Sequence, residues 1–207
     1  QNVWWLPAIR FKKDLWWLTF PYPIDSEMKR GPFWARRNRN LATAIKNQMK
    51  QAIQFAETGF PADVVELVDI EIKDLEPNDV LLDVLAAAIN PSHLLTLSGR
   101  YGTQPELPAV PGTEGLGRVA EIGSSVINLR QGDLVMIPLY SGTWCQQVIV
   151  KANHIRFTFP PKKKLRDGIL LQLAMLMANP PTAWLLLKSV VNLPPGSWVI
   201  QNAANSA

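Results

Sequence analysis

Cysteine and histidine are scarce in this chain of 207 residues, which has one cysteine, Cys145, and two histidines, His93 and His154. A single cysteine cannot form a disulfide within the chain, and a cysteine-rich zinc site is excluded for the same reason. Long apolar runs are also missing, since no uninterrupted stretch reaches the roughly 18 residues that a membrane span needs. We therefore expect no membrane span, and the cytoplasm or a reducing organelle matrix as the compartment.

Acidic residues are few in the N-terminal part of the chain. Residues 1–48 hold nine Lys/Arg and three Asp/Glu, a balance of +6, whereas residues 49–207 have a balance of −2. The net charge of +4 therefore belongs to the N-terminal segment, and the main part of the chain gives no reason to expect nucleic acid as a partner. The same segment holds five of the eight tryptophans, which are Trp4, Trp5, Trp16, Trp17 and Trp34.

The tryptophan-rich segment allows three interpretations. Tryptophans and cations together suit an arm that lies in a lipid headgroup layer. A transit peptide is a second possibility, although serine is scarce and the tryptophans and prolines fit it poorly. The third is that residues 1–48 are not native protein but upstream sequence that was read through. We expect these residues to lie outside any domain, because the regular alternation of polar and apolar residues begins only at Met49.

From Met49 onward the pattern is typical of short strands separated by turns. Alternating segments cover about residues 50–58 and 64–72, and buried or half-buried strands are expected over residues 80–90, 115–123, 133–138 and 142–155. A short helix over residues 93–98 would follow Ser92 as its N-cap. Strands spaced in this way favour a partly open β-barrel.

After the basic loop at residues 160–167, the pattern changes to helix. Residues 170–191 read as a helix interrupted by Asn179-Pro180-Pro181, with Thr182 starting a second helix. A strand is expected over residues 196–200, and the chain then continues as QNAANSA. A buried strand that leads into a tight turn is the position of the phosphate-binding loop in a dinucleotide fold.

Two motifs give the chain a family resemblance: NPSH followed by LLTLS and GRY at residues 90–101, and NPPTA at residues 179–183. The chain resembles the zinc-free branch of the medium-chain dehydrogenase/reductase superfamily, in particular its trans-2-enoyl-thioester reductases and quinone reductases. The resemblance implies a GroES-like partly open β-barrel as the catalytic domain at 49–160, and the first helices and strand of an incomplete Rossmann domain at 161–207. Met49 resembles the natural start of these reductases, which would leave residues 1–48 as upstream sequence.

The resemblance makes Tyr101 the candidate catalytic residue. A phenol hydroxyl can donate a hydrogen bond or a proton to the enolate that develops when an enoyl thioester is reduced. His93 stands where the family commonly has aspartate, and a lone histidine is more often structural than catalytic. Zinc-dependent relatives carry histidine in a GHE motif, but this chain has Gly112-Thr113-Glu114. We therefore expect no catalytic metal.

The same resemblance implies NADPH as the cofactor, bound by Asn179, Thr182, Asn205, Ser206 and Ala207. The expected substrate is a small enoyl thioester or a quinone, and the expected assembly is a homodimer, in the cytoplasm or, in a eukaryote, the mitochondrion. Enoyl-thioester reduction is the favoured function because a quinone reductase needs no tyrosine acid. A non-catalytic scaffold or membrane-associated module is the alternative from another class, and residues 1–48 are the feature that supports it.

Overall fold

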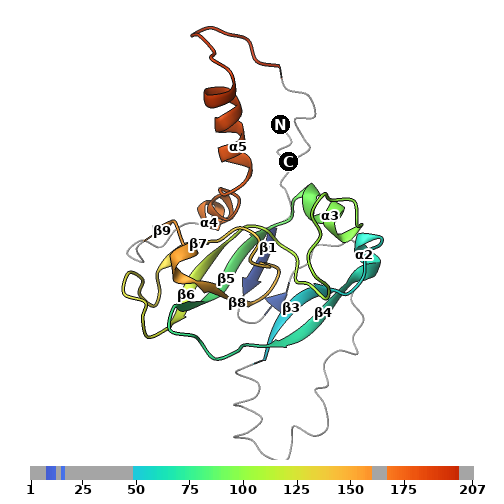
Figure 1. The fold of residues 1–207 in the computed structure, drawn as a ribbon, viewed down its shortest axis with the longest axis vertical. Helices are drawn as coiled ribbons and strands as arrows, with labels where there is room; N and C mark the ends of the chain where they lie inside the picture. The colour runs from blue at the N-terminus through green and yellow to red at the C-terminus, as the bar shows by residue number, and fades with distance from the viewer. Residues whose placement is uncertain (1–7, 13–14, 17–48, 160–166, 201–207) are drawn as a thin grey trace, which may run out of the picture.

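The computed structural model describes residues 8–12, 15–16, 49–159 and 167–200. Its centre is a sheet with strand order β2-β1-β5-β6-β7-β9, in which β8 also pairs with β5 (Figure 1). These strands are β1 (Ala8–Lys12), β2 (Leu15–Trp16), β5 (Asp79–Ala88), β6 (Gly115–Ile122), β7 (Leu134–Ile137), β8 (Gln147–Lys151) and β9 (Thr158–Phe159).

A two-stranded sheet of β3 (Met49–Phe55) and β4 (Val65–Glu71) packs beside the larger sheet. Single bridges from Ala52 to Cys145 and from Phe55 to Ala109 join the two sheets. Ala52, Phe55, Val80 and Leu82 are at most 1% exposed and belong to one continuous core. The two open sheets around this core confirm the predicted partly open barrel, and the strands expected between residues 49 and 155 are found near their predicted positions.

The segment β1 lies antiparallel to β5, with Ala8 opposite Ala88 and Arg10 opposite Ala86. The strand β8 occupies the other half of the same edge, from Asp79 to Asp83. The backbone of residues 8–12 thus extends the large sheet, although we expected residues 1–48 to lie outside the barrel. Apart from β2 (Leu15–Trp16), the remainder of that tryptophan-rich segment lies outside the described residues.

The short helix α3 (Pro91–Leu97) is attached to the barrel through Leu97, which is 1% exposed in the core. We expected Ser92 to be the N-cap, but Asn90 occupies that position and Pro91 is the first helical residue. The reason is that a residue before proline prefers extended backbone, which suits an N-cap, while proline suits the first helical turn.

The C-terminal part contains α4 (Asp167–Ala174), α5 (Asn179–Leu185) and a π-helical turn, η4 (Leu186–Val190). α4 covers the sheet, because Ala174 packs with Ala86 and Leu116, whereas α5 projects away from the barrel (Figure 1). The prediction that Thr182 starts the second helix is wrong: α5 begins at Asn179, and the Thr182 hydroxyl donates to the carbonyl of Ala178 at 2.8 Å.

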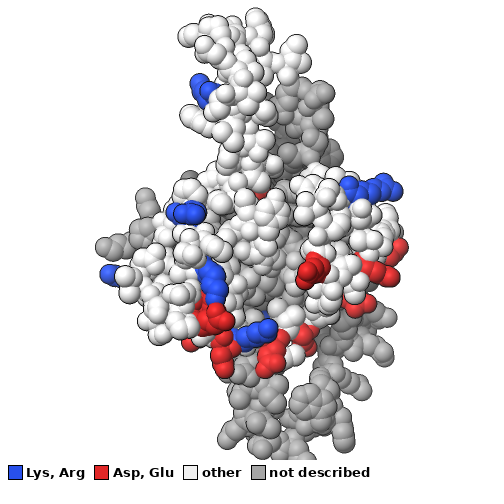
Figure 2. Space-filling view, in the orientation of Figure 1, with Lys and Arg blue, Asp and Glu red and all other residues white. Residues whose placement is uncertain are grey.

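The strand expected over residues 196–200 is not formed in the structure. A strand needs a neighbouring strand to accept its backbone hydrogen bonds, and residues 196–200 are exposed with no such neighbour among the described residues. Large apolar side chains are exposed on α5 and η4, with Trp184 64% and Val190 69% exposed. Charged side chains are few on this part of the molecule in the view of Figure 2. Among the described residues no single helix is long and apolar enough to cross a membrane, and only α4 with α5–η4 passes that test as a pair, bent by 62°.

Candidate active site

Tyr101 follows α3 by way of a tight turn at Gly99. The backbone amides of Arg100 and Tyr101 both donate to the carbonyl of Leu95, at 2.8 and 3.1 Å, which closes the end of the helix. Gly99 has a φ of +72°, and a Cβ there would lie 3.1 Å from the Thr58 hydroxyl oxygen. Glycine is therefore favoured by the backbone conformation, and any other residue would also crowd the Thr58 side chain. The turn that Gly99 permits sets the position of Tyr101.

Two cavities meet at Tyr101. The larger, of about 530 Å³, is bounded by α3, the loop from Thr103 to Pro105 and the turn from Val110 to Gly112. The smaller, of about 400 Å³, reaches Ala178 and Asn179 at the start of α5. Tyr101, Ser92, Thr113 and Tyr140 line both cavities. Tyr101 is 38% exposed, so its ring is available to a molecule that enters from either side.

Asn179 is the predicted cofactor residue that the structure brings to the same cavity as Tyr101. Thr182 is exposed one turn further along α5, and its hydroxyl is bonded within its own helix. Asn205, Ser206 and Ala207 lie outside the described residues. The structure therefore brings together Tyr101 and Asn179, and the cofactor role of all five residues stays a prediction.

His93 is 2% exposed and serves the local structure of α3. Its Nδ1 accepts a hydrogen bond from the backbone amide of Asn90 at 3.0 Å, so the ring proton belongs on Nε2, which can donate to the Thr113 hydroxyl at 2.8 Å. The backbone amide nitrogen of Thr113 also lies 3.0 Å from Nε2. A protonated Nε2 has no free lone pair, so in this tautomer it cannot accept a hydrogen bond from that amide. The ring meets Trp144 edge to face, with 5.4 Å between centroids.

The surroundings of His93 favour the neutral ring. Burial lowers the pKa of His93 from 6.5 to about 4, because the charged ring would lose its hydration. Protonation of Nδ1 would also remove the acceptor of the Asn90 amide. His93 thus helps to hold α3 against Thr113, which agrees with the expectation that a lone histidine is structural.

Glu114 is the site residue that sequence reasoning missed. Its carboxylate is fully buried: one oxygen accepts from the Asn90 side-chain amide at 2.9 Å, and the other from the backbone amides of Met177 and Ala178 at 3.1 and 3.0 Å. One carboxylate therefore ties the motif that precedes α3 to the joint between α4 and α5. The sequence does place an acidic residue between glycines at the start of an expected buried strand. A buried carboxylate is stable only when it is hydrogen-bonded, so this position could have been read as a structural acceptor.

Gly112 allows the segment Thr143–Trp144 to approach the backbone that precedes Glu114 closely. Its φ is +104°, and a Cβ at this position would meet the Thr143 hydroxyl and lie 2.8 Å from the Thr143 amide nitrogen. Metal ligands are not gathered here, and the described residues contain no group of three or more His, Cys, Asp or Glu side chains that could hold a metal ion. Gly112-Thr113-Glu114 instead supplies a turn, a cavity wall and a buried hydrogen-bond acceptor.

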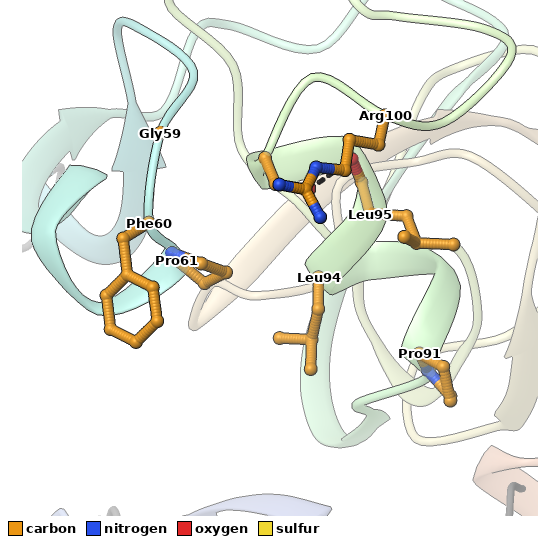
Figure 3. A pocket seen from close by; sticks show the side chains of 8 residues that line it. Gly59, Phe60, Pro61, Pro91, Leu94, Leu95 and Arg100 are labelled. Atoms are coloured by element: carbon orange, nitrogen blue, oxygen red, sulfur yellow. Dashed lines mark hydrogen bonds between the residues drawn. The ribbon is translucent and has the colours of Figure 1, made fainter.

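A third hollow, of about 720 Å³, lies on the opposite side of α3, between this helix and α2 (Pro61–Val64). Figure 3 shows Phe60 and Leu94 on its two sides and Arg100 at one end. Phe60 is 70% exposed. Tyr101 does not line this hollow, and Pro91 is the residue that lines both the hollow and the smaller cavity.

The sequence model of one protein family, the alcohol dehydrogenase GroES-like domain, matches residues 76–166. Enoyl-[acyl-carrier-protein] reductase of mitochondria from Mus musculus is 38% identical over 178 residues, which cover 84% of this chain and 46% of the relative. The human protein of the same name is 40% identical over 158 residues, which cover 75% of this chain and 40% of the relative. The chain belongs to the medium-chain dehydrogenase/reductase superfamily. It spans about half the length of the curated relatives that it matches.

Solved structures in the superfamily agree with this assignment. A mitochondrial 2-enoyl thioester reductase heterodimer from Candida tropicalis matches with a TM-score of 0.63 and 30% identity, over 72% of this chain and 45% of that chain. A reductase from Bacillus thuringiensis, described as an NADPH:quinone reductase, matches with a TM-score of 0.59 and 34% identity, over 70% and 42% of the two chains. Both superfamily branches expected from the sequence are thus represented.

Proposed function

We propose that the full-length gene product containing residues 1–207 uses NADPH to reduce the 2,3 double bond of an enoyl thioester. The observation that carries the proposal is the position of Tyr101 where two cavities meet, one of which reaches Asn179. The proposal is supported by the name of the mouse relative and by a related reductase structure described as a complex with NADP and crotonyl-CoA.

The smaller cavity is chemically suited to one end of the cofactor. Its volume of about 400 Å³ lies in the range of small-molecule sites, and its wall carries the amide of Asn179 and the hydroxyls of Ser92 and Thr113. We propose that Asn179 holds the nicotinamide–ribose end, with Thr182 supporting α5, and that Asn205, Ser206 and Ala207 contribute to phosphate binding. NADPH, when bound, supplies the hydride that is added to C3 of the enoyl group.

Tyr101 supplies the chemistry of the protein itself. Negative charge develops on the thioester oxygen as C3 is reduced, and the phenol hydroxyl donates a hydrogen bond to that oxygen. A proton taken from solvent water adds at C2 and completes the saturated acyl thioester. The Glu114 carboxylate acts from a distance, since it holds the residues before α3 and the α4–α5 joint on either side of the smaller cavity.

The Tyr101→Phe variant tests this function. It keeps the ring and removes one donor, so turnover of an enoyl thioester should fall by on the order of 10²-fold or more, with folding and NADPH affinity nearly unchanged. Both proteins should be assayed with NADPH against a 2-enoyl thioester and a quinone. Full thioester turnover by the variant would leave Tyr101 without a catalytic role.

Quinone reduction is the second candidate, because quinone reductases are among the matched structures. It needs the same cofactor but no acid on the protein. Quinone turnover that Tyr101→Phe leaves unchanged, together with absent thioester turnover, would favour this reaction. A scaffold role for residues 1–48 would be supported if mass spectrometry found that segment in the mature protein and neither reaction were catalysed.

Location and assembly follow from the same relatives. The mouse and human relatives are named as mitochondrial, and we propose that location if the source is a eukaryote. The matched structure from Candida tropicalis is described as a heterodimer, whereas we propose a homodimer for this protein. Light scattering on the purified gene product, at several concentrations, would detect a monomer and so contradict the homodimer.

A further inference from the structure

Tyr140 combines an unusual backbone conformation with a position at the candidate active site. Its φ is +65°, the only positive value for a residue other than glycine among the described residues. A left-handed conformation strains an aromatic residue, and such strain is concentrated at functional sites. The ring is 74% exposed, and Tyr140 lines both cavities that meet at Tyr101.

The strained conformation is held by contacts on both sides of Tyr140. Its backbone amide donates to the carbonyl of Thr113 at 2.9 Å, and Gly142 donates to the carbonyl of Gly112 at 3.1 Å. The hydroxyl of Ser141 donates to the carbonyl of Pro138 at 2.7 Å. The turn at residues 138–142 is thus bonded to the chain that leads into Glu114, which fixes the backbone from which the Tyr140 side chain projects at the cavity wall.

The two cavities differ in what they can hold. The smaller reaches Asn179 and presents amide and hydroxyl groups, whereas the larger is lined in part by Phe55, Val110 and Pro111. If the reacting double bond lies on the Asn179 side, the apolar wall of the larger cavity suits the alkyl chain of the acyl group. The group on the other side of the thioester, a carrier arm rich in amide groups, would lose hydration against that apolar wall, which makes it the less suitable occupant of the larger cavity.

We propose that Tyr140 is a specificity-determining residue that covers the acyl chain where the two cavities meet, and so favours enoyl thioesters with longer alkyl chains. The ring would shield methylene groups that otherwise stay in contact with water. The proposal rests on the proposed enoyl-thioester function. It adds that the length of the acyl chain is the feature of the substrate for which the enzyme selects.

The test compares kcat/KM for enoyl thioesters of four to ten acyl carbons, using the full-length gene product, its Tyr140→Ala and Tyr140→Gly variants, and Phe60→Ala as the control. Phe60 is an exposed aromatic of similar accessibility that lines the separate hollow beside α2. The wild type and Phe60→Ala should gain up to about fourfold per added methylene while the chain is being buried. Both Tyr140 variants should lose most of this gain.

The possible outcomes distinguish the specificity role of Tyr140, the proposed enoyl-thioester function and the strained backbone at Tyr140. A chain-length dependence that Tyr140→Ala leaves unchanged, or a loss that is equal for every chain length, would overturn the specificity role while leaving enoyl-thioester reduction intact. No turnover of any enoyl thioester by the wild type would instead contradict the proposed function. The Tyr140→Gly variant should melt a few degrees above Tyr140→Ala, roughly 2–8 °C, because only alanine retains the left-handed strain. Equal melting temperatures would contradict the strained backbone.

Discussion

Glu114 accepts a hydrogen bond from the side-chain amide of Asn90 across 2.9 Å, and both residues are buried. The contact joins the start of β6 to the residue that caps α3. The second oxygen of the same carboxylate accepts from two backbone amides at the α4–α5 joint. Glu114 therefore helps to set the position of Asn179 relative to Tyr101, together with the packing of α4 on the sheet, although it touches neither residue in the contacts described.

We expect the Glu114→Gln variant to be less stable by about 1–3 kcal/mol, because the amide group would place an N–H against N–H donors in a buried site. Urea denaturation would measure the loss, and hydrogen exchange should show weaker protection of the Met177 and Ala178 amides. Glu121→Gln is the matched control, since Glu121 is an exposed residue of β6. Equal stability of Glu114→Gln and Glu121→Gln would contradict the linking role.

The buried His93 predicts a loss of stability in mild acid. Its folded pKa of about 4 lies below the ordinary 6.5, so the unfolded chain binds the proton first as the pH falls. This contribution is fully present above pH 6.5, and on the order of 2 kcal/mol of it should be lost by pH 5. His93→Gln, which does not titrate, should show a smaller difference in unfolding free energy between pH 7 and pH 5. A slope equal to that of the wild type would show that other groups cause the loss.

Chelator should not inhibit the reductase reaction, and added zinc should not raise it. The reason is that Gly112-Thr113-Glu114 offers no imidazole and Glu114 is engaged with three donors. The measurement is thioester turnover by the full-length gene product before and after EDTA, with a zinc-dependent alcohol dehydrogenase as the positive control. Activity that is lost with EDTA and recovered with zinc would overturn the zinc-free assignment.

We propose residues 49–160 as one folding unit, because the main core runs from Ala52 to Val150. A segment of residues 49–160 should unfold cooperatively when heated, as followed by circular dichroism. A segment of residues 49–178 should be more stable, since α4 covers Ala86 and Leu116. A gradual transition in both segments would mean that residues 1–48 or the remaining C-terminal residues are needed for folding.

The sequence by itself was sufficient for the strands of the barrel, and a family resemblance made Tyr101 the candidate catalytic residue. Alternating residues such as those of β3 place every second side chain on one face, so burial could be inferred without knowing the partner strand. The NPSH and GRY motifs singled out Tyr101 only through their resemblance to the enoyl-thioester reductases, and its catalytic role stays a prediction. The structure adds that Gly99, within the GRY motif, has a left-handed conformation that suits glycine.

Only the tertiary structure decided what surrounds that tyrosine. The role of Glu114 depends on amides 63 and 64 residues away in the chain, and the strain at Tyr140 depends on the Thr113 carbonyl, so no local pattern shows either. The same reason explains the missing strand at residues 196–200, whose composition suits a sheet but which has no neighbouring strand in the described structure. Local sequence sets which conformations a segment can adopt, whereas contacts between distant segments determine which of them is formed and what it can bind.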